Sequence, residues 1–231
     1  MHTKRVAHPL AWLATFWEGR QGLLLRRFSL AARRATPKMV MVVDACPWGI
    51  GGFLCTLDGK VISFFWDKLD QEDATALRTP IGESAGQGVW EALAVLIALK
   101  LWAAHAAHGR MRLSVRSDSV TAISAVTKLS ARTSVLNALG AEMALILEEN
   151  ECSHPEVAHV SGVSNKVADA LSRLAITGEK IPEACVGAKQ RVAPRRDSRL
   201  LRLFPHASNL IAFSLLQNIP FESRERSLFI S

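Results

Sequence analysis

The apolar residues that follow position 38 occur in short β-prone runs separated by turn signals. MVMVVDAC (39–46) is rich in β-branched side chains, as expected of a central strand. PWGIGG provides a turn and GFLCTL (52–57) a second run, and an Asp-Gly pair (58–59) is a hairpin signal before KVISFFW (60–66). This part of the chain is therefore predicted to form an antiparallel meander of three strands.

The pattern then changes to helical spacing. A polar connection over 67–88 is predicted to lead into a long apolar helix from about Gln87 to Ala107, followed by a fourth strand over 111–118. Two helices over 119–129 and 134–150 come next, and Ser134 is the predicted cap of the second. A fifth strand over 156–160 and a helix opening near Ser164 complete the pattern. The order βββαβααβα requires a crossover helix between strands three and four. The predicted fold class is α/β, with a five-stranded mixed sheet and helices on its faces.

Four acidic residues stand where a lone carboxylate is costly or unusual: Asp44, Glu91, Asp118 and Asp169. Asp44 is near the end of an apolar strand, and Glu91 is the one acid of a helix that is apolar on nearly every face. Burying either without a partner would cost free energy or force protonation. Each acid also has a simpler interpretation, because a turn, an exposed first helical turn and a helix N-terminus all accommodate acidic residues.

Considered together, the four acids predict a metal site. Two of them end strands and two stand near helix starts, positions that a sheet-and-helix core can bring to one point. Converging carboxylates repel one another unless a cation lies between them. Mg²⁺ suits such a site because it uses few carboxylates and keeps waters and phosphate oxygens. Two ions roughly 4 Å apart can activate a water and stabilise the leaving oxygen of a phosphodiester.

Four motifs carry a family resemblance. VDACPWGIGGFL, WEALAVLIAL, VRSDSVTAISAV and HVSGVSNKVADALSRL, in that order, resemble the ribonuclease H domain of retrotransposon reverse transcriptases, of the gypsy-like and DIRS-like kinds. The last motif is similar to an H-x-x-G-x-x-N-x-x-A-D-x-L-S-R ending, which this chain matches from His159 to Arg173. The resemblance covers about residues 39–175. It implies a ribonuclease-H-like fold and hydrolysis of the RNA strand of an RNA–DNA hybrid with two Mg²⁺ or Mn²⁺ ions.

The resemblance also assigns roles to individual residues. By motif position, the metal-binding and catalytic carboxylates would be Asp44, Glu91, Asp118 and Asp169. Glu83 is the competing choice for the helix acid, but the Ala-Leu-Ala that follows fits Glu91 better. His159 and Asn165 would support the site through hydrogen bonds. Many cellular ribonucleases H have a second histidine three residues after the first, where this chain has Gly162, so the step assigned to that histidine has no counterpart residue at this position.

The net charge of +7 is unevenly distributed. Residues 1–38 carry 8 basic and 1 acidic side chains, residues 39–175 carry 11 and 15, and residues 176–231 carry 9 and 5. Basic flanks can bind phosphates, although they are also compatible with plain solvation. The acidic middle predicts weak binding of a hybrid by itself, so a polymerase domain of the same element or the flanks would supply affinity.

These features divide the chain into three parts. Residues 1–36 are read as a basic extension, the tail of a preceding polymerase or connection module, with a mitochondrial transit peptide as the alternative. Residues 37–175 are the ribonuclease-H-like domain, and residues 176–231 are predicted to be a basic, poorly ordered linker and tail. The four cysteines show no disulfide or zinc pattern and no apolar run is long enough to span a membrane. An intracellular location, cytoplasmic or nuclear, is expected, with mitochondria as the alternative, and no membrane partner is expected.

Two other functions are compatible with these motifs. The first is a catalytically inactive ribonuclease-H-like domain with a structural or tethering role. The second is another nuclease of the same fold, an integrase or a Holliday-junction resolvase. Integrases of that fold place their glutamate last, so the order Asp, Glu, Asp, Asp favours ribonuclease H.

Overall fold

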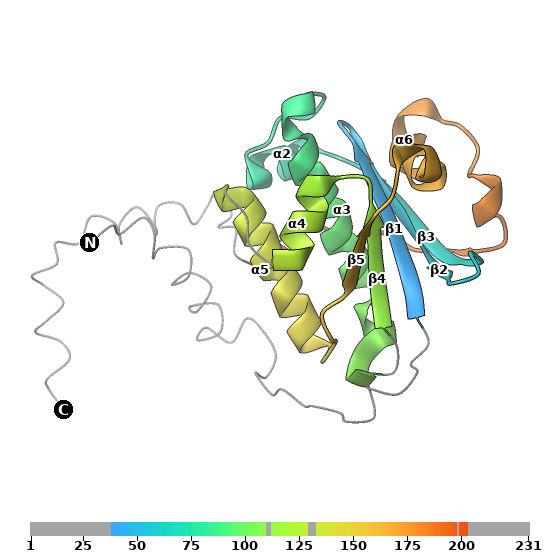
Figure 1. Cartoon of the computed structure of the whole chain (residues 1–231). Coiled ribbons are helices and arrows are strands. Elements are labelled where there is room, and N and C mark those ends of the chain that lie inside the picture. The colour runs from blue at the N-terminus through green and yellow to red at the C-terminus, as the bar shows by residue number, and fades with distance from the viewer. Residues whose placement is uncertain (1–37, 110–111, 129–132, 198, 203–231) are drawn as a thin grey trace, which may run out of the picture.

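A computed structural model of the protein describes residues 38–109, 112–128, 133–197 and 199–202. They build a six-stranded sheet in the order β5-β4-β1-β2-β3-β6 (Figure 1). The strands are β1 (Lys38–Cys46), β2 (Gly49–Thr56), β3 (Val61–Lys68), β4 (Arg112–Ser117), β5 (Glu156–His159) and β6 (Lys189–Gln190). The meander β1–β2–β3 is antiparallel, β4 is parallel to β1, β5 to β4, and β6 to β3. The predicted α/β class with a mixed sheet is confirmed, and the sheet has one short strand more than expected.

Helices cover both faces of this sheet. They are α2 (Gln71–Leu77), α3 (Gln87–Trp102), α4 (Val120–Lys128), α5 (Ser134–Glu149) and α6 (Lys166–Thr177). Figure 1 shows α2 to α5 on one side and α6 on the other. Because α3 is packed between the sheet and neighbouring helices, Trp90, Leu93, Leu96 and Leu99 are all buried. The cap of α5 is Thr133, whose hydroxyl accepts the Leu136 amide, and not Ser134 as predicted.

Residues 84–107 are long and apolar enough for a membrane-spanning helix by length and composition, with a mean hydropathy of 1.5. Yet 72% of that apolar window is buried inside the fold. Its apolar surface is therefore already used in packing, as in the core helix of a globular domain.

The first strand pair differs from the prediction at its turn. Residues 47–52 are predicted to be a turn, but β2 already begins at Gly49, so Pro47 and Trp48 alone connect the strands. The glycines have a packing role, since a Cβ on Gly51 would lie 2.5 Å from the Ser172 amide nitrogen of α6. Glycine has a low strand propensity, but here it allows a helix to approach the strand backbone.

The predicted polar connection over 67–88 contains the helix α2. Asp70 caps it by accepting the Asp73 amide at 2.9 Å, and the Asp73 side chain accepts the Asp70 amide at 3.1 Å. This is a capping box with aspartate in both places. The sequence shows little apolar periodicity here, so the helix was missed.

A segment predicted to be a poorly ordered linker instead packs on the domain. We call residues 178–197 and 199–202 the C-terminal strap. Cys185 is buried against Phe64 of β3, and β6 pairs with β3. Leu200 and Leu201 are buried in the main core on the opposite face. The folded region therefore extends beyond residue 175 to at least 202, whereas residues 1–36 and 203–231 lie outside the described residues.

Two arginines with buried side chains hold the C-terminal strap on the domain through ion pairs. Arg196 is bound by Asp73 at 2.6 Å and by Asp67, and Arg202 by Glu142 at 3.1 Å and by Glu149. The polar and basic composition of the strap predicts a linker. In the structure, however, its two arginines bind acidic residues that are more than 50 positions away in the sequence. Only the tertiary structure provides those partners.

Candidate active site

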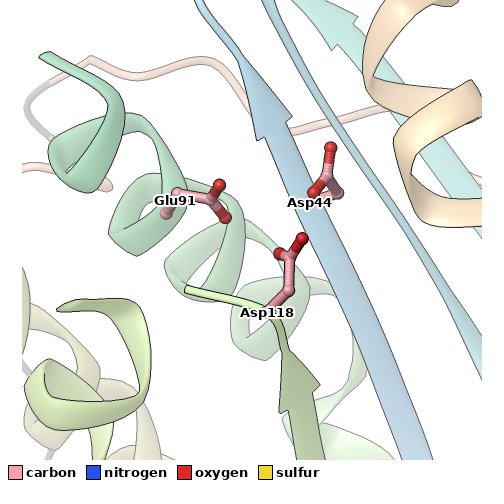
Figure 2. A group of neighbouring side chains, drawn as sticks. All are labelled: Asp44, Glu91 and Asp118. Atoms are coloured by element: carbon pink, nitrogen blue, oxygen red, sulfur yellow. The ribbon is translucent and has the colours of Figure 1, made fainter. Parts of the chain in front are cut away.

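Three of the predicted carboxylates meet at one end of the sheet. Asp44 comes from β1, Asp118 follows β4 and Glu91 comes from α3, and one carboxylate oxygen of each lies within 4.8 Å of the others. Figure 2 shows the three side chains directed toward one another. The register explains the pairing of the two aspartates: Val42 lies opposite Arg116 in parallel strands, and each aspartate comes two residues later. We call Asp44, Glu91 and Asp118 the acidic cluster.

Glu91 reaches the cluster from the second turn of α3 and is only 5% exposed. Gln87, one turn earlier, donates an amide hydrogen to Glu91 Oε1 at 3.0 Å and also to the backbone carbonyl of Ala45. It thereby fixes the carboxylate relative to β1. Glu83 is exposed at the start of a 3₁₀ turn and lies outside the cluster. Gln87 was not predicted; its i,i+4 spacing from Glu91 is the signal that could have identified it.

Asp44 is 5% exposed and is held by two side chains of the last motif. Ser172 donates to Asp44 Oδ2 at 2.8 Å, and Asn165 Nδ2 lies 3.2 Å from Asp44 Oδ1 and 3.4 Å from Asp118 Oδ1. One buried amide thus bridges two carboxylates that would otherwise repel. Asn165 thus contacts both aspartates while its supporting role stays a prediction, and Ser172 is an addition to the predicted set.

Burial and mutual repulsion perturb the acids. Desolvation raises the pKa of Asp44 from 3.8 to about 7, with smaller contributions from the charges of Asp118 and Asp169, while the Ser172 hydrogen bond opposes the rise. Desolvation, followed by the charge of Asp44, raises the pKa of Glu91 from 4.5 to about 8. A buried like-charged pair disfavours its ionised form, so the metal-free cluster holds protons near neutral pH that a cation would displace.

Asp169, the fourth predicted ligand, lies at the edge of this arrangement. Its carboxylate is 45% exposed and accepts a hydrogen bond from Arg173 Nε at 2.8 Å. It is near enough to raise the pKa of Asp44, yet it is not one of the three acids whose oxygens meet. Its role as a metal ligand therefore stays a prediction.

The His159 side chain contacts the backbone of Asp118, one of the cluster residues. Its Nε2 lies 3.1 Å from the carbonyl oxygen of Asp118, across the β4–β5 pair. Gly162 is adjacent, since a Cβ there would lie 3.4 Å from Asp118 Oδ2. His159 thus lies at the turn that presents Asp118, and its supporting role stays a prediction.

Unpartnered oxygens indicate what the cluster lacks. Among the described residues, the buried side-chain oxygens without a hydrogen-bond partner are Gln87 Oε1, Glu91 Oε2 and Asn165 Oδ1. All three belong to side chains that contact the cluster, and all three are acceptors. A buried unpaired acceptor is costly, and a hydrated cation would satisfy such atoms. The oxygen-only donor set fits Mg²⁺ or Mn²⁺.

Comparison with known proteins gives structural similarity without a sequence match. No family model and no curated protein matches the chain. Ribonuclease H1 from the archaeon Halobacterium salinarum aligns at 17% identity over 62% of this chain and 99% of its own, with a TM-score of 0.48. LC11 ribonuclease H1, isolated from compost by a metagenomic approach, aligns at 21% identity over 62% and 98%, with a TM-score of 0.46. A structure of LC11 with an RNA/DNA hybrid aligns at 17% identity over 58% and 92%, with a TM-score of 0.43.

The fold class follows from the chain's own topology. The antiparallel meander, the crossover through α3 to a strand parallel to β1, and the second parallel strand β5 form an α/β fold with a mixed sheet. Because β1 and β4 are central neighbours, their carboxyl ends place two aspartates side by side. In open α/β sheets, sites form at such ends.

Proposed function

We propose that this chain is a metal-dependent ribonuclease H that hydrolyses the RNA strand of RNA–DNA hybrids. The acidic cluster, together with the unpartnered acceptor oxygens of Glu91 and of its neighbours Gln87 and Asn165, is the observation that carries this proposal. The cluster residues Asp44, Glu91 and Asp118 would hold two Mg²⁺ or Mn²⁺ ions, with Asp169 as the fourth ligand. When bound, such ions activate a water and stabilise the oxygen that leaves the phosphodiester.

The residues around the cluster have positioning roles in this proposal. Asn165 keeps Asp44 and Asp118 at a fixed separation, and Gln87 orients Glu91. Ser172 holds the second oxygen of Asp44, so its rotamer is set before any ligand arrives. Such preorganisation reduces the reorganisation needed for the reaction.

We further propose that the chain belongs to a retroelement reverse transcriptase and acts inside the cell. The motif resemblance, with all four acids in order, supports this context. In residues 39–175 acids outnumber bases by 15 to 11, and most of the excess positive charge is in residues 1–38. A polymerase domain of the same element and these basic flanks would therefore supply most of the phosphate contacts.

The test is cleavage of a labelled RNA–DNA hybrid by the full chain with Mg²⁺ or Mn²⁺. Glu91→Gln is compared with Glu83→Gln, which makes the same chemical change on an exposed residue nearby. We expect metal-dependent RNA cleavage that is lost in Glu91→Gln and kept in Glu83→Gln. Equal loss in both variants, or cleavage that persists in EDTA, would contradict the proposal.

Two alternatives stay distinguishable in the same assay. Duplex DNA and a four-way junction serve as parallel substrates, and cleavage of either in preference to the hybrid would favour an integrase or a resolvase. A folded protein that binds hybrid but cuts nothing would favour an inactive tethering domain.

A further inference from the structure

Trp48 is a large exposed side chain four residues after Asp44 of the acidic cluster. It occupies the two-residue turn between β1 and β2 and is 46% exposed. Single exposed apolar residues are common on protein surfaces, so exposure alone is no evidence of a binding role. The contacts that hold the turn of Trp48, and the position of Trp48 relative to Asp44, are more informative about its role.

The turn that carries Trp48 is fixed on two sides. The Leu69 amide donates to the Trp48 carbonyl, and the Gly82 amide donates to the Pro47 carbonyl, both at 2.9 Å. Gly82 has φ +85°, and a Cβ on it would lie 3.2 Å from Trp48 Nε1 and 3.6 Å from Cε2. One edge of the indole thus lies close to a residue without a side chain, and Trp48 as a whole is 46% exposed.

Trp48 is close to a cluster residue along the chain, which limits its distance from the cluster. It follows Asp44 by four residues, which span at most about 14 Å when extended. That is the rise of roughly four nucleotides at 3.4 Å each. Val120 begins α4 two residues after Asp118 and is 72% exposed. Each of the two cluster aspartates is therefore followed closely along the chain by an exposed apolar side chain, Trp48 on the β1–β2 turn and Val120 at the start of α4.

We propose that Trp48 is a substrate-positioning residue that packs its indole against a nucleotide near the scissile phosphate. This inference rests on the proposed function and specifies how that site holds its substrate. The minor groove of an A-form-like duplex is wide and shallow, so a flat ring on a rigid turn can contact ribose and base edges there. Such contact requires no positive charge, which suits a region, residues 39–175, whose acids outnumber its bases by 15 to 11.

The experiment compares Trp48→Ala and Trp48→Phe with Leu57→Ala in the full chain. Leu57 is 63% exposed at the far end of β2, so its truncation is the matched apolar control. Cleavage gives KM and kcat, and binding to a labelled hybrid is measured in an Asp118→Asn background. Aromatic–base contacts removed by alanine change affinity by roughly 5- to 100-fold. We expect Trp48→Ala to raise KM and Kd at least fivefold with little change in kcat, Trp48→Phe to recover most of the loss, and Leu57→Ala to match wild type.

Tryptophan emission provides a second readout that does not depend on alanine variants folding. Trp90 and Trp102 are fully buried. We expect hybrid binding to change the emission of the Asp118→Asn protein, and this change to shrink in Asp118→Asn with Trp48→Phe. If the change is undiminished and Trp48→Ala binds like wild type, the inference is overturned while the ribonuclease proposal stands. If the chain binds hybrid without cutting it, the ribonuclease proposal fails and the Kd comparison still decides the role of Trp48. If it binds no nucleic acid, both are overturned.

Discussion

Replacing Asp44 by asparagine should abolish the proposed RNA cleavage and stabilise the metal-free protein. The pKa of Asp44 is raised from 3.8 to about 7 by burial and neighbouring acids, so its ionised form is disfavoured in the folded state. Each tenfold change in the protonation equilibrium corresponds to about 1.4 kcal/mol, so the folded protein loses up to roughly 4 kcal/mol as pH rises from 4 to 8. An amide carries no charge and avoids this cost.

The local geometry accommodates the substitution. Asp44 Oδ1 faces the Asn165 amide, so a carbonyl oxygen of the new side chain keeps that contact. Asp44 Oδ2 accepts from Ser172, whose hydroxyl also lies 2.9 Å from the Asp169 carbonyl and can donate there instead. The hydroxyl can then accept a hydrogen from the new amide.

Thermal and urea unfolding without metal, at pH 4.5 and pH 8, measure the effect. We expect similar stability at the lower pH, where Asp44 is protonated in the fold. At pH 8 the variant should be more stable by about 2–4 kcal/mol, or roughly 5–12 °C in Tm for a chain of this size. Mg²⁺ should raise the Tm of wild type, more at pH 8 than at pH 6, because binding requires deprotonated carboxylates.

The same measurements can refute this reasoning. If Asp44→Asn is less stable than wild type at pH 8, the cluster is not an electrostatically strained site. If Mg²⁺ raises the Tm of Asp44→Asn as much as that of wild type, the ion binds elsewhere.

Three further predictions test the surroundings of the cluster. Asn165→Ala removes the amide shared by two carboxylates, so we expect about 1–3 kcal/mol lower stability by urea unfolding and a large loss of cleavage; unchanged stability would deny Asn165 its bridging role. Gly51→Ala introduces a Cβ 2.5 Å from the α6 backbone, which should cost roughly 1–3 kcal/mol and weaken Mg²⁺ binding measured by calorimetry, with no ligand altered. Arg196→Met leaves buried Asp73 without its ion-pair partner, so we expect the free energy of unfolding to fall by about 3–5 kcal/mol. The control Arg195→Met, on an exposed residue, should change the free energy of unfolding by less than about 0.5 kcal/mol. Equal effects of the two variants would argue against the ion pair holding the strap on the domain.

The sequence alone determined the α/β class and most element positions, and it singled out four acids, three of which meet in the fold. The strands from Met39 and the apolar helix around Glu91 are local patterns, and apolar periodicity reports them directly. A charged residue inside an apolar run is also a local signal, which is why Asp44 and Glu91 could be recognised without a structure. The choice of Glu91 over Glu83 agrees with the position of each in the fold.

Other features depend on contacts between distant parts of the chain. The early start of β2 depends on α6 lying against Gly49 and Gly51, and the strap depends on acids on α2 and α5 that face Arg196 and Arg202. The bridging by Asn165 likewise exists only when β1 and β4 lie side by side. Burial, which raises the pKa values of the cluster, is a property of the packed state. Periodicity and spacing describe each element, but the partners of a polar side chain are decided by the tertiary structure.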